Sequence, residues 1–109
     1  MTKIIVKKRA DGCYQSFECI GHAGYADSGS DIVCAAISIL VINTINSLET
    51  LTKEEMQYTE NSEKGRIQCV FQQPLSEGGV LLMDAMLLGL SFIKKQYGKK
   101  YLNVKIKEV

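Results

Sequence analysis

An apolar segment over residues 32–45 constrains the fold of this chain more than any other feature, because it contains no charged residue. It is interrupted by three polar side chains and falls short of the roughly 20 residues that cross a bilayer. Its apolar residues follow helical spacing and cover nearly every side of the helix. We therefore expect a buried, central helix from residue 31 to about residue 51, with Asp31 or Ser30 as its N-cap.

The composition is that of one compact domain, which we assign to residues 1–109. With 46% hydrophobic residues and a net charge of +1, the chain is too apolar for intrinsic disorder and lacks the dense basic run of a nucleic-acid binder. The first residues do not resemble a secretory signal, so we expect a cytoplasmic protein without disulfides, a membrane partner or a nucleic-acid partner. The four cysteines form no C-x-x-C pair and there is one histidine, so we expect no metal and no cofactor.

Alternating apolar residues predict two β-hairpins and a final strand. The first hairpin covers residues 4–20, the second covers residues 56–71, and the last strand covers residues 102–107. A second helix, introduced by Ser76, runs to Tyr97, with Gly98 as its stop. The order ββαββαβ predicts an α+β two-layer sandwich, a mostly antiparallel sheet with two helices packed on one face.

The second helix carries more apolar residues than the single stripe that one sheet can bury. We therefore expect a homodimer that pairs through this helix near Leu82, Met86 and Leu90, with Gly89 allowing close approach. In the alternative, the first helix covers the excess within one chain. The apolar residues concerned are Val80, Leu81, Leu82, Met83, Met86, Leu87, Leu88, Leu90, Phe92 and Ile93.

Between the first hairpin and the first helix lies the segment GHAGYADSGSD, whose composition favours a mobile loop built on Gly21, Gly24 and Gly29. His22, the only histidine, opens this loop, and Cys34 follows it in the first turn of the predicted helix. A thiol attacks as the thiolate, which the positive end of a helix dipole and a neighbouring imidazolium both favour. His22 would then act as general acid to a leaving amine, so the two residues form a candidate catalytic pair.

Each residue also has a structural interpretation. A lone cysteine in an apolar helix is usually a packed core residue. Cys19 and Cys69 lie at inward strand positions and Cys13 lies in a turn with no acid or base nearby in sequence, so we assign these three cysteines no chemical role. Asp31 caps the helix or orients His22, and we favour capping. Ser38, one turn beyond Cys34, contacts the thiol or the substrate, or else bonds to the carbonyl four residues earlier. Backbone N–H groups of Cys34 and its neighbours are the natural candidates for oxyanion donors.

The run GHAGYADSGSDIVCAAIS, residues 21–38, resembles the signature of the ribosomal-processing cysteine protease family, Prp. The resemblance implies a cytosolic endopeptidase that removes a short N-terminal extension from the large-subunit ribosomal protein L twenty-seven. It also implies that His22 and Cys34 are the catalytic dyad, that Asp31 matches a family position, and that the protein is a homodimer with a mobile loop over its site.

Two other functions use the same residues. In one, the chain is a non-catalytic ribosome-associated binding module, the loop is a docking element and Cys34 is packed. In the other, Cys34 is a redox-sensing thiol, which Cys19 would have to approach through the sheet to resolve. For the protease, the small net charge predicts recognition through apolar and aromatic residues before the scissile bond.

Overall fold

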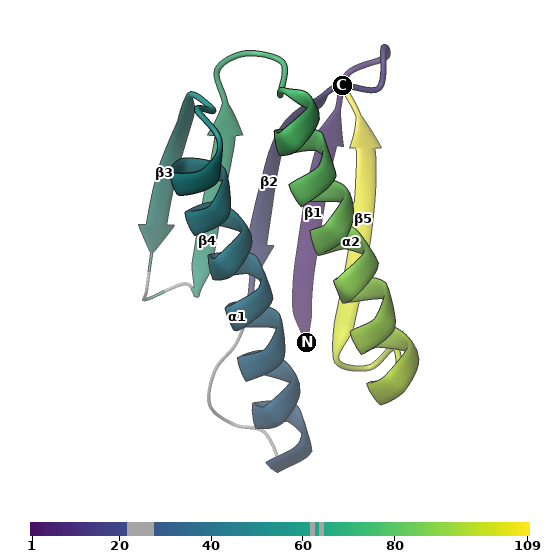
Figure 1. Cartoon of the computed structure of the whole chain (residues 1–109). Helices are drawn as coiled ribbons and strands as arrows, with labels where there is room; N and C mark the ends of the chain where they lie inside the picture. The colour runs from purple at the N-terminus through teal and green to yellow at the C-terminus, as the bar shows by residue number, and fades with distance from the viewer. Residues whose placement is uncertain (22–27, 62, 64) are drawn as a thin grey trace.

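The computed structural model describes residues 1–21, 28–61, 63 and 65–109, and of residues 28–31 it describes the backbone only. Five strands and two helices follow one another in the expected order ββαββαβ (Figure 1). Their bounds are β1 Thr2–Lys8, β2 Tyr14–Ile20, α1 Ser28–Leu51, β3 Met56–Asn61, β4 Arg66–Phe71, α2 Glu77–Tyr97 and β5 Leu102–Glu108.

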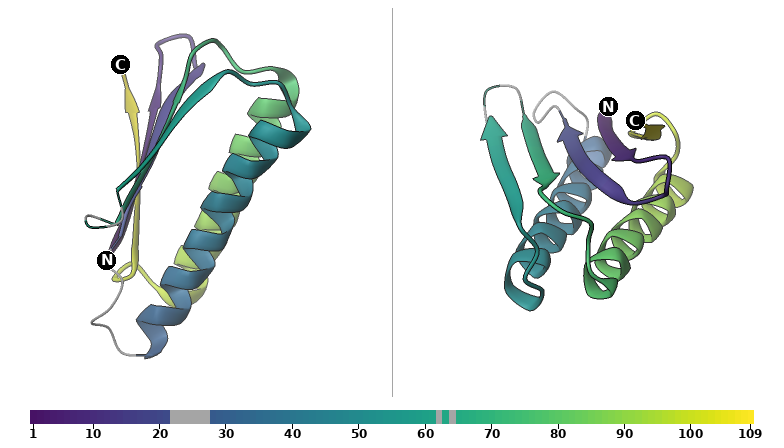
Figure 2. Two further views of the ribbon diagram at one scale, coloured as in Figure 1. Left: turned by 90° about the vertical axis from the view of Figure 1, so that its left-hand side faces the viewer. Right: turned by 90° about the horizontal axis from the view of Figure 1, so that it is seen from above.

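The strands form one sheet in the order β3-β4-β2-β1-β5. All neighbouring strands are antiparallel except β1 and β5, which are parallel. Both helices lie on the same face of this sheet and leave the other face open (Figure 2). The predicted α+β two-layer sandwich with a mostly antiparallel sheet is therefore confirmed.

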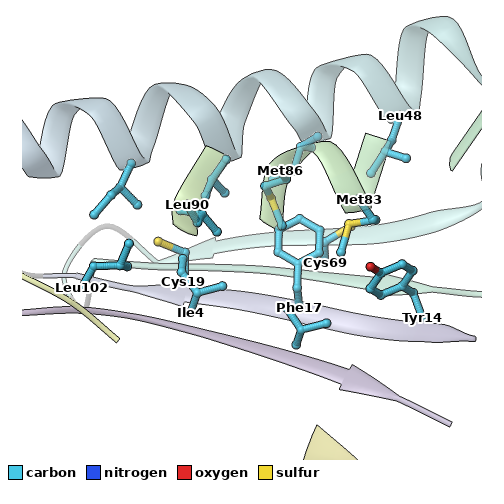
Figure 3. Close-up of a cluster of buried hydrophobic side chains, with 14 of the residues drawn as sticks. Ile4, Tyr14, Phe17, Cys19, Leu48, Cys69, Met83, Met86, Leu90 and Leu102 are labelled. Atoms are coloured by element: carbon cyan, nitrogen blue, oxygen red, sulfur yellow. The ribbon is translucent and has the colours of Figure 1, made fainter. Parts of the chain in front are cut away.

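Alternate strand residues build the core, as period-two patterning requires. Ile4 on β1, Phe17 on β2 and Cys69 on β4 are at most 1% exposed, and they point toward the helices (Figure 3). From α2, the fully buried residues Met83, Met86 and Leu90 pack into the same core. Helix α1 contributes one buried stripe, formed by Val33, Ile37, Val41, Ile45 and Leu48.

Helix α1 begins at Ser28, three residues before the expected start. Asp31 and Ser30 therefore lie inside the helix, and the prediction that either caps it is wrong. A run of serine, glycine and aspartate offers several equivalent caps, so local preference does not select one of them. As a consequence Gly29 belongs to the helix rather than to the loop, and Cys34 lies in the second turn rather than the first.

The expected central position of α1 is also wrong, because the helix is in the outer layer and only one of its faces packs on the sheet. Ile32, Ile39 and Leu51 on the remaining faces are 57%, 70% and 74% exposed. By length and composition alone, Ile32–Leu51 is long and apolar enough to cross a membrane, with a mean hydropathy of 1.8. The core helix of a soluble protein can be equally long and apolar, and one third of this apolar stretch of α1 is buried inside the fold.

Helix α2 matches the prediction at both ends. The hydroxyl of Ser76 accepts a hydrogen bond of 3.1 Å from the Gly79 N–H, and Gly98 ends the helix with φ of 102°.

The predicted dimer seam on α2 is wrong, because Met86 and Leu90 are buried against the sheet and Leu82 is half-buried. Gly89 serves a contact within the chain: a Cβ there would lie 2.8 Å from Cδ2 of Leu40 on α1. Helical spacing shows that a stripe exists, but the packing of the two helices decides which stripe faces the sheet.

Candidate functional site

A cavity of about 290 Å³ lies at the end of the sheet where β2 ends and β4 begins. This is also the end at which β1 starts and α1 begins (Figure 1). Helix α1 supplies one side of the cavity, and the ends of the strands supply the other. The lining residues are Thr2, Cys19, Gly21, Cys34, Ser38, Ile42, Glu60, Asn61, Gly65, Arg66 and Ile67.

Three residues of α1 face this cavity at intervals of four, which places them on one side of the helix. Cys34 is half-buried, while Ser38 and Ile42, one and two turns further on, are exposed. The structure therefore brings two of the residues singled out from the sequence, Cys34 and Ser38, onto one wall.

The Cys34 thiol contacts a hydroxyl that sequence analysis missed. Thr2 Oγ1 lies 3.8 Å from Cys34 Sγ, and the Thr2 side chain is 3% exposed. The Thr2 N–H donates to the Tyr101 carbonyl at 2.9 Å, which holds this first strand residue in place. Once the thiol is ionised only the hydroxyl can donate, so Thr2 is placed to stabilise a thiolate. Nothing in the sequence marks Thr2, because the contact joins residues 32 positions apart.

The other three thiols are held protonated. Burial raises the pKa of Cys19 to about 11, with a smaller contribution from nearby Cys34, and burial raises that of Cys69 to about 12. In the turn between β1 and β2, a hydrogen bond to the Asp11 carboxylate raises the pKa of Cys13. Since the thiolate is the nucleophilic form, these three cysteines are poor nucleophiles at neutral pH. Cys34, which is half-buried, lies at the cavity.

The chain reaches the cavity from β2 through Gly21. The Gly21 N–H donates to the Gly65 carbonyl at 2.9 Å, across the ends of β2 and β4. His22, bonded to Gly21, and Gly24 lie outside the described residues. Gly29 and Asp31 lie in the first turn of α1.

The early start of α1 changes two expectations about Cys34. The helix dipole acts mainly within the first turn, so it contributes less to a thiolate in the second turn. The four N–H groups without intrahelical partners also belong to the first turn, so the Cys34 N–H is committed to the helix. The expectation that Cys34 itself donates to an oxyanion is therefore wrong.

Charged residues occupy the strand side of the cavity. Arg66 Nη2 and Nε lie 2.7 and 2.9 Å from Glu18 Oε2, so the charge of Arg66 is neutralised by its partner. Glu60 accepts a hydrogen bond of 2.9 Å from the Tyr58 hydroxyl. Among the residues that the structure describes, no three His, Cys, Asp or Glu side chains come together as metal ligands.

Comparison with known proteins identifies relatives along nearly the whole chain. A family model described as cysteine protease Prp matches residues 1–102. A protein of Bacillus subtilis (strain 168), named ribosomal processing cysteine protease Prp, is 27% identical over 101 residues, which cover 89% of this chain and 90% of that protein.

Solved structures share the fold. SMU.848 from Streptococcus mutans superposes with a TM-score of 0.88 at 28% identity, covering 100% of this chain and 99% of that one. The ribosomal processing protease Prp from S. aureus, in complex with a covalently linked product peptide, gives a TM-score of 0.86 at 22% identity and covers 98% and 100% of the two chains.

Proposed function

The chain belongs to the cysteine protease Prp family and is a cysteine protease of ribosomal protein processing, and from this we propose that it removes the N-terminal extension of ribosomal protein L twenty-seven. In this proposal His22 and Cys34 are the catalytic dyad of a cytoplasmic homodimer. The observation that carries the dyad is the position of Cys34, a half-buried thiol on a cavity wall, when burial or a carboxylate keeps the other three thiols protonated.

In the reaction, His22 takes the proton from Cys34, and Sγ attacks the carbonyl carbon of the scissile bond. A C–S bond forms, the C–N bond breaks, and His22 delivers the proton to the leaving amine. A water molecule then attacks the thioester carbonyl while His22 takes its proton, the C–S bond breaks to release the new carboxyl terminus, and His22 returns the proton to the Cys34 thiolate. The Thr2 hydroxyl, 3.8 Å from Sγ, stabilises the thiolate before the attack.

The lining of the cavity favours an apolar peptide. Cys19, Ile42 and Ile67 contribute apolar walls. The charge of Arg66 is neutralised by its salt bridge with Glu18. Glu60 is then the one unneutralised charge among the described lining residues. The binding energy available to a substrate therefore comes mainly from the burial of apolar side chains.

The first prediction tests reaction and substrate together. Incubation of the purified protein with the full-length ribosomal precursor should release a shortened protein with a new N-terminus, read by mass spectrometry. Replacing each apolar or aromatic residue before the scissile bond with aspartate should reduce cleavage about 10-fold to 100-fold, because a buried charge replaces apolar contact. Asparagine at the same positions is the control for charge.

Two outcomes would contradict this proposal. Binding of the precursor without any cleavage would support the alternative, a non-catalytic ribosome-associated module. Cleavage that depends on basic residues after the bond, with little effect of the apolar ones, would mean that Glu60 rather than the apolar wall selects the substrate.

A homodimer is the second part of the proposal, and we expect it to pair through the exposed apolar residues of the helical layer. On the outer side of α2, Leu81, Leu88 and Phe92 are 68%, 59% and 59% exposed, and Ile39 of α1 is 70% exposed. Apolar side chains grouped on one helical layer are typical of a surface that a partner covers. A two-fold pairing would cover it with the same surface of a second copy.

Light scattering at micromolar concentration should give about twice the chain mass of 12.1 kDa. Leu88→Asp and Phe92→Asp should reduce the mass to that of one chain, because each would bury a charge between two copies. Ile106→Asp, at an apolar residue 56% exposed on β5, is the matched control and should leave the dimer intact. A single-chain mass for the unmodified protein would contradict the dimer.

A further inference from the structure

Gly65, at the start of β4, is required to be glycine for two independent reasons. Its φ of +59° lies in the left-handed region that side chains disfavour. A Cβ built on Gly65 would also overlap the backbone carbonyl oxygen of Gly21, well inside the 3.0 Å that Cβ atoms keep from other atoms. The second reason concerns a backbone atom, which has no rotamer by which to move aside.

The same two residues are joined by a hydrogen bond. The Gly21 N–H donates to the Gly65 carbonyl at 2.9 Å, immediately beyond the last paired residues of the two strands, Ile20 and Arg66. Gly65 thus holds Gly21 by one backbone bond and by a contact that only a bare α-carbon permits. The salt bridge between Arg66 and Glu18 secures the same end of β4 against β2.

On its other side Gly21 meets Thr2. A Cβ on Gly21 would lie 3.2 Å from Thr2 Oγ1, which is the atom that lies 3.8 Å from Cys34 Sγ. Gly21 is therefore confined between β4 and β1, and its position is tied through Thr2 to the position of the thiol. Gly21 is also the last described residue before His22, whose nitrogen is bonded to the confined carbonyl carbon.

We propose that Gly65 is a positioning residue for the proteolytic reaction: its missing side chain lets Gly21 lie against β4 and Thr2, and so fixes the point from which the chain continues to His22. This inference rests on the dyad of the proposed function. Displacing the Gly21 carbonyl would shift the atom to which His22 is bonded, while the substrate walls on α1 stay in place. A misplacement on the order of 1 Å costs roughly 100-fold in rate.

Gly12 offers a matched control. It too has a positive φ, +89°, but a Cβ there meets nothing within 4 Å. Gly12→Ala therefore reports the cost of backbone strain in a turn, and Gly65→Ala reports that cost plus the overlap with Gly21. Asparagine tolerates positive φ better than alanine, so Gly65→Asn and Gly12→Asn repeat the comparison with less strain.

The experiment measures kcat and KM for a precursor peptide, and the rate of Cys34 alkylation by iodoacetamide as a function of pH. Both Gly65 variants should lower kcat by roughly 10-fold to 100-fold with KM within about twofold. Their alkylation profiles should move toward that of His22→Ala. Both Gly12 variants should keep the kinetics and the alkylation profile of the unmodified protein. Circular dichroism should show the same folded content in all four.

The outcomes separate the inference from the function on which it rests. Gly65 variants that match the Gly12 variants in kcat and in alkylation would overturn the inference alone. Failure of both Gly65 variants to fold would also overturn it, since the overlap would then act on the fold rather than on His22. If His22→Ala leaves cleavage and alkylation unchanged, the dyad fails and the inference fails with it.

Discussion

Cys34→Ala should abolish cleavage of the precursor, a loss of at least about 10⁴-fold in kcat/KM, while the fold stays intact. The thioester cannot form without Sγ. The other three thiols are unable to replace it, because burial or the Asp11 carboxylate keeps them protonated. Alanine removes only the sulfur atom of one half-buried side chain, and alanine favours helix. The loss of activity will therefore not come from unfolding. Cleavage kinetics and thermal unfolding together check both halves of this prediction.

The control for Cys34→Ala is Cys19→Ala, which removes the other thiol of the same cavity. The rate of cleavage by Cys19→Ala should stay within a few-fold of that of the unmodified protein. The Cys19 thiol is protonated at neutral pH, so it lines the cavity and does not act as the nucleophile. Cys34→Ser should be as inactive as Cys34→Ala, because a hydroxyl is far less ionised than a thiol. Retained cleavage by Cys34→Ala would refute the mechanism.

His22→Ala should lower cleavage about 10²-fold or more, through loss of the group that takes and returns the proton. The early start of α1 makes this expectation stronger, because a thiolate in the second turn gains less from the helix dipole and depends more on an imidazolium. The measurement is paired: peptide cleavage, and mass analysis after treatment with iodoacetamide.

In the unmodified protein alkylation should be selective for Cys34, and in His22→Ala this selectivity should be lost. Uniform slow labelling of all four cysteines in both proteins would instead mean that Cys34 is a packed residue without a base. A disulfide between Cys34 and Cys19 on mild oxidation would favour the redox-sensing interpretation.

Local patterns were sufficient for the strands and for α2. Alternation at Ile4 and Val6, and again at Cys69 and Phe71, marks residues that are buried in the fold. A period of two leaves one choice of face once a single side of the sheet is covered. The ends of α2 could also be predicted from the sequence, because Ser76 and Gly98 bond to backbone groups only three or four residues away.

Local patterns were insufficient for α1 and for the buried face of α2. Where several residues can cap a helix equally well, as before Cys34, the start depends on how the chain returns from the sheet. The prediction that Met86 and Leu90 face a partner failed for a related reason. An apolar helix has more than one apolar stripe that could face the sheet. The packing of α1 against α2, with Leu40 against Gly89, decides which stripe of α2 is buried.

The sequence by itself therefore determined the order of elements, the inward faces of the strands and the pair of residues, His22 and Cys34, proposed for the chemistry. Only the tertiary structure decided what surrounds the thiol. Thr2, Gly21 and Gly65 come from distant parts of the chain and meet at one end of the sheet. Their contacts depend on strand order and register, which long-range packing sets and no neighbouring residue encodes.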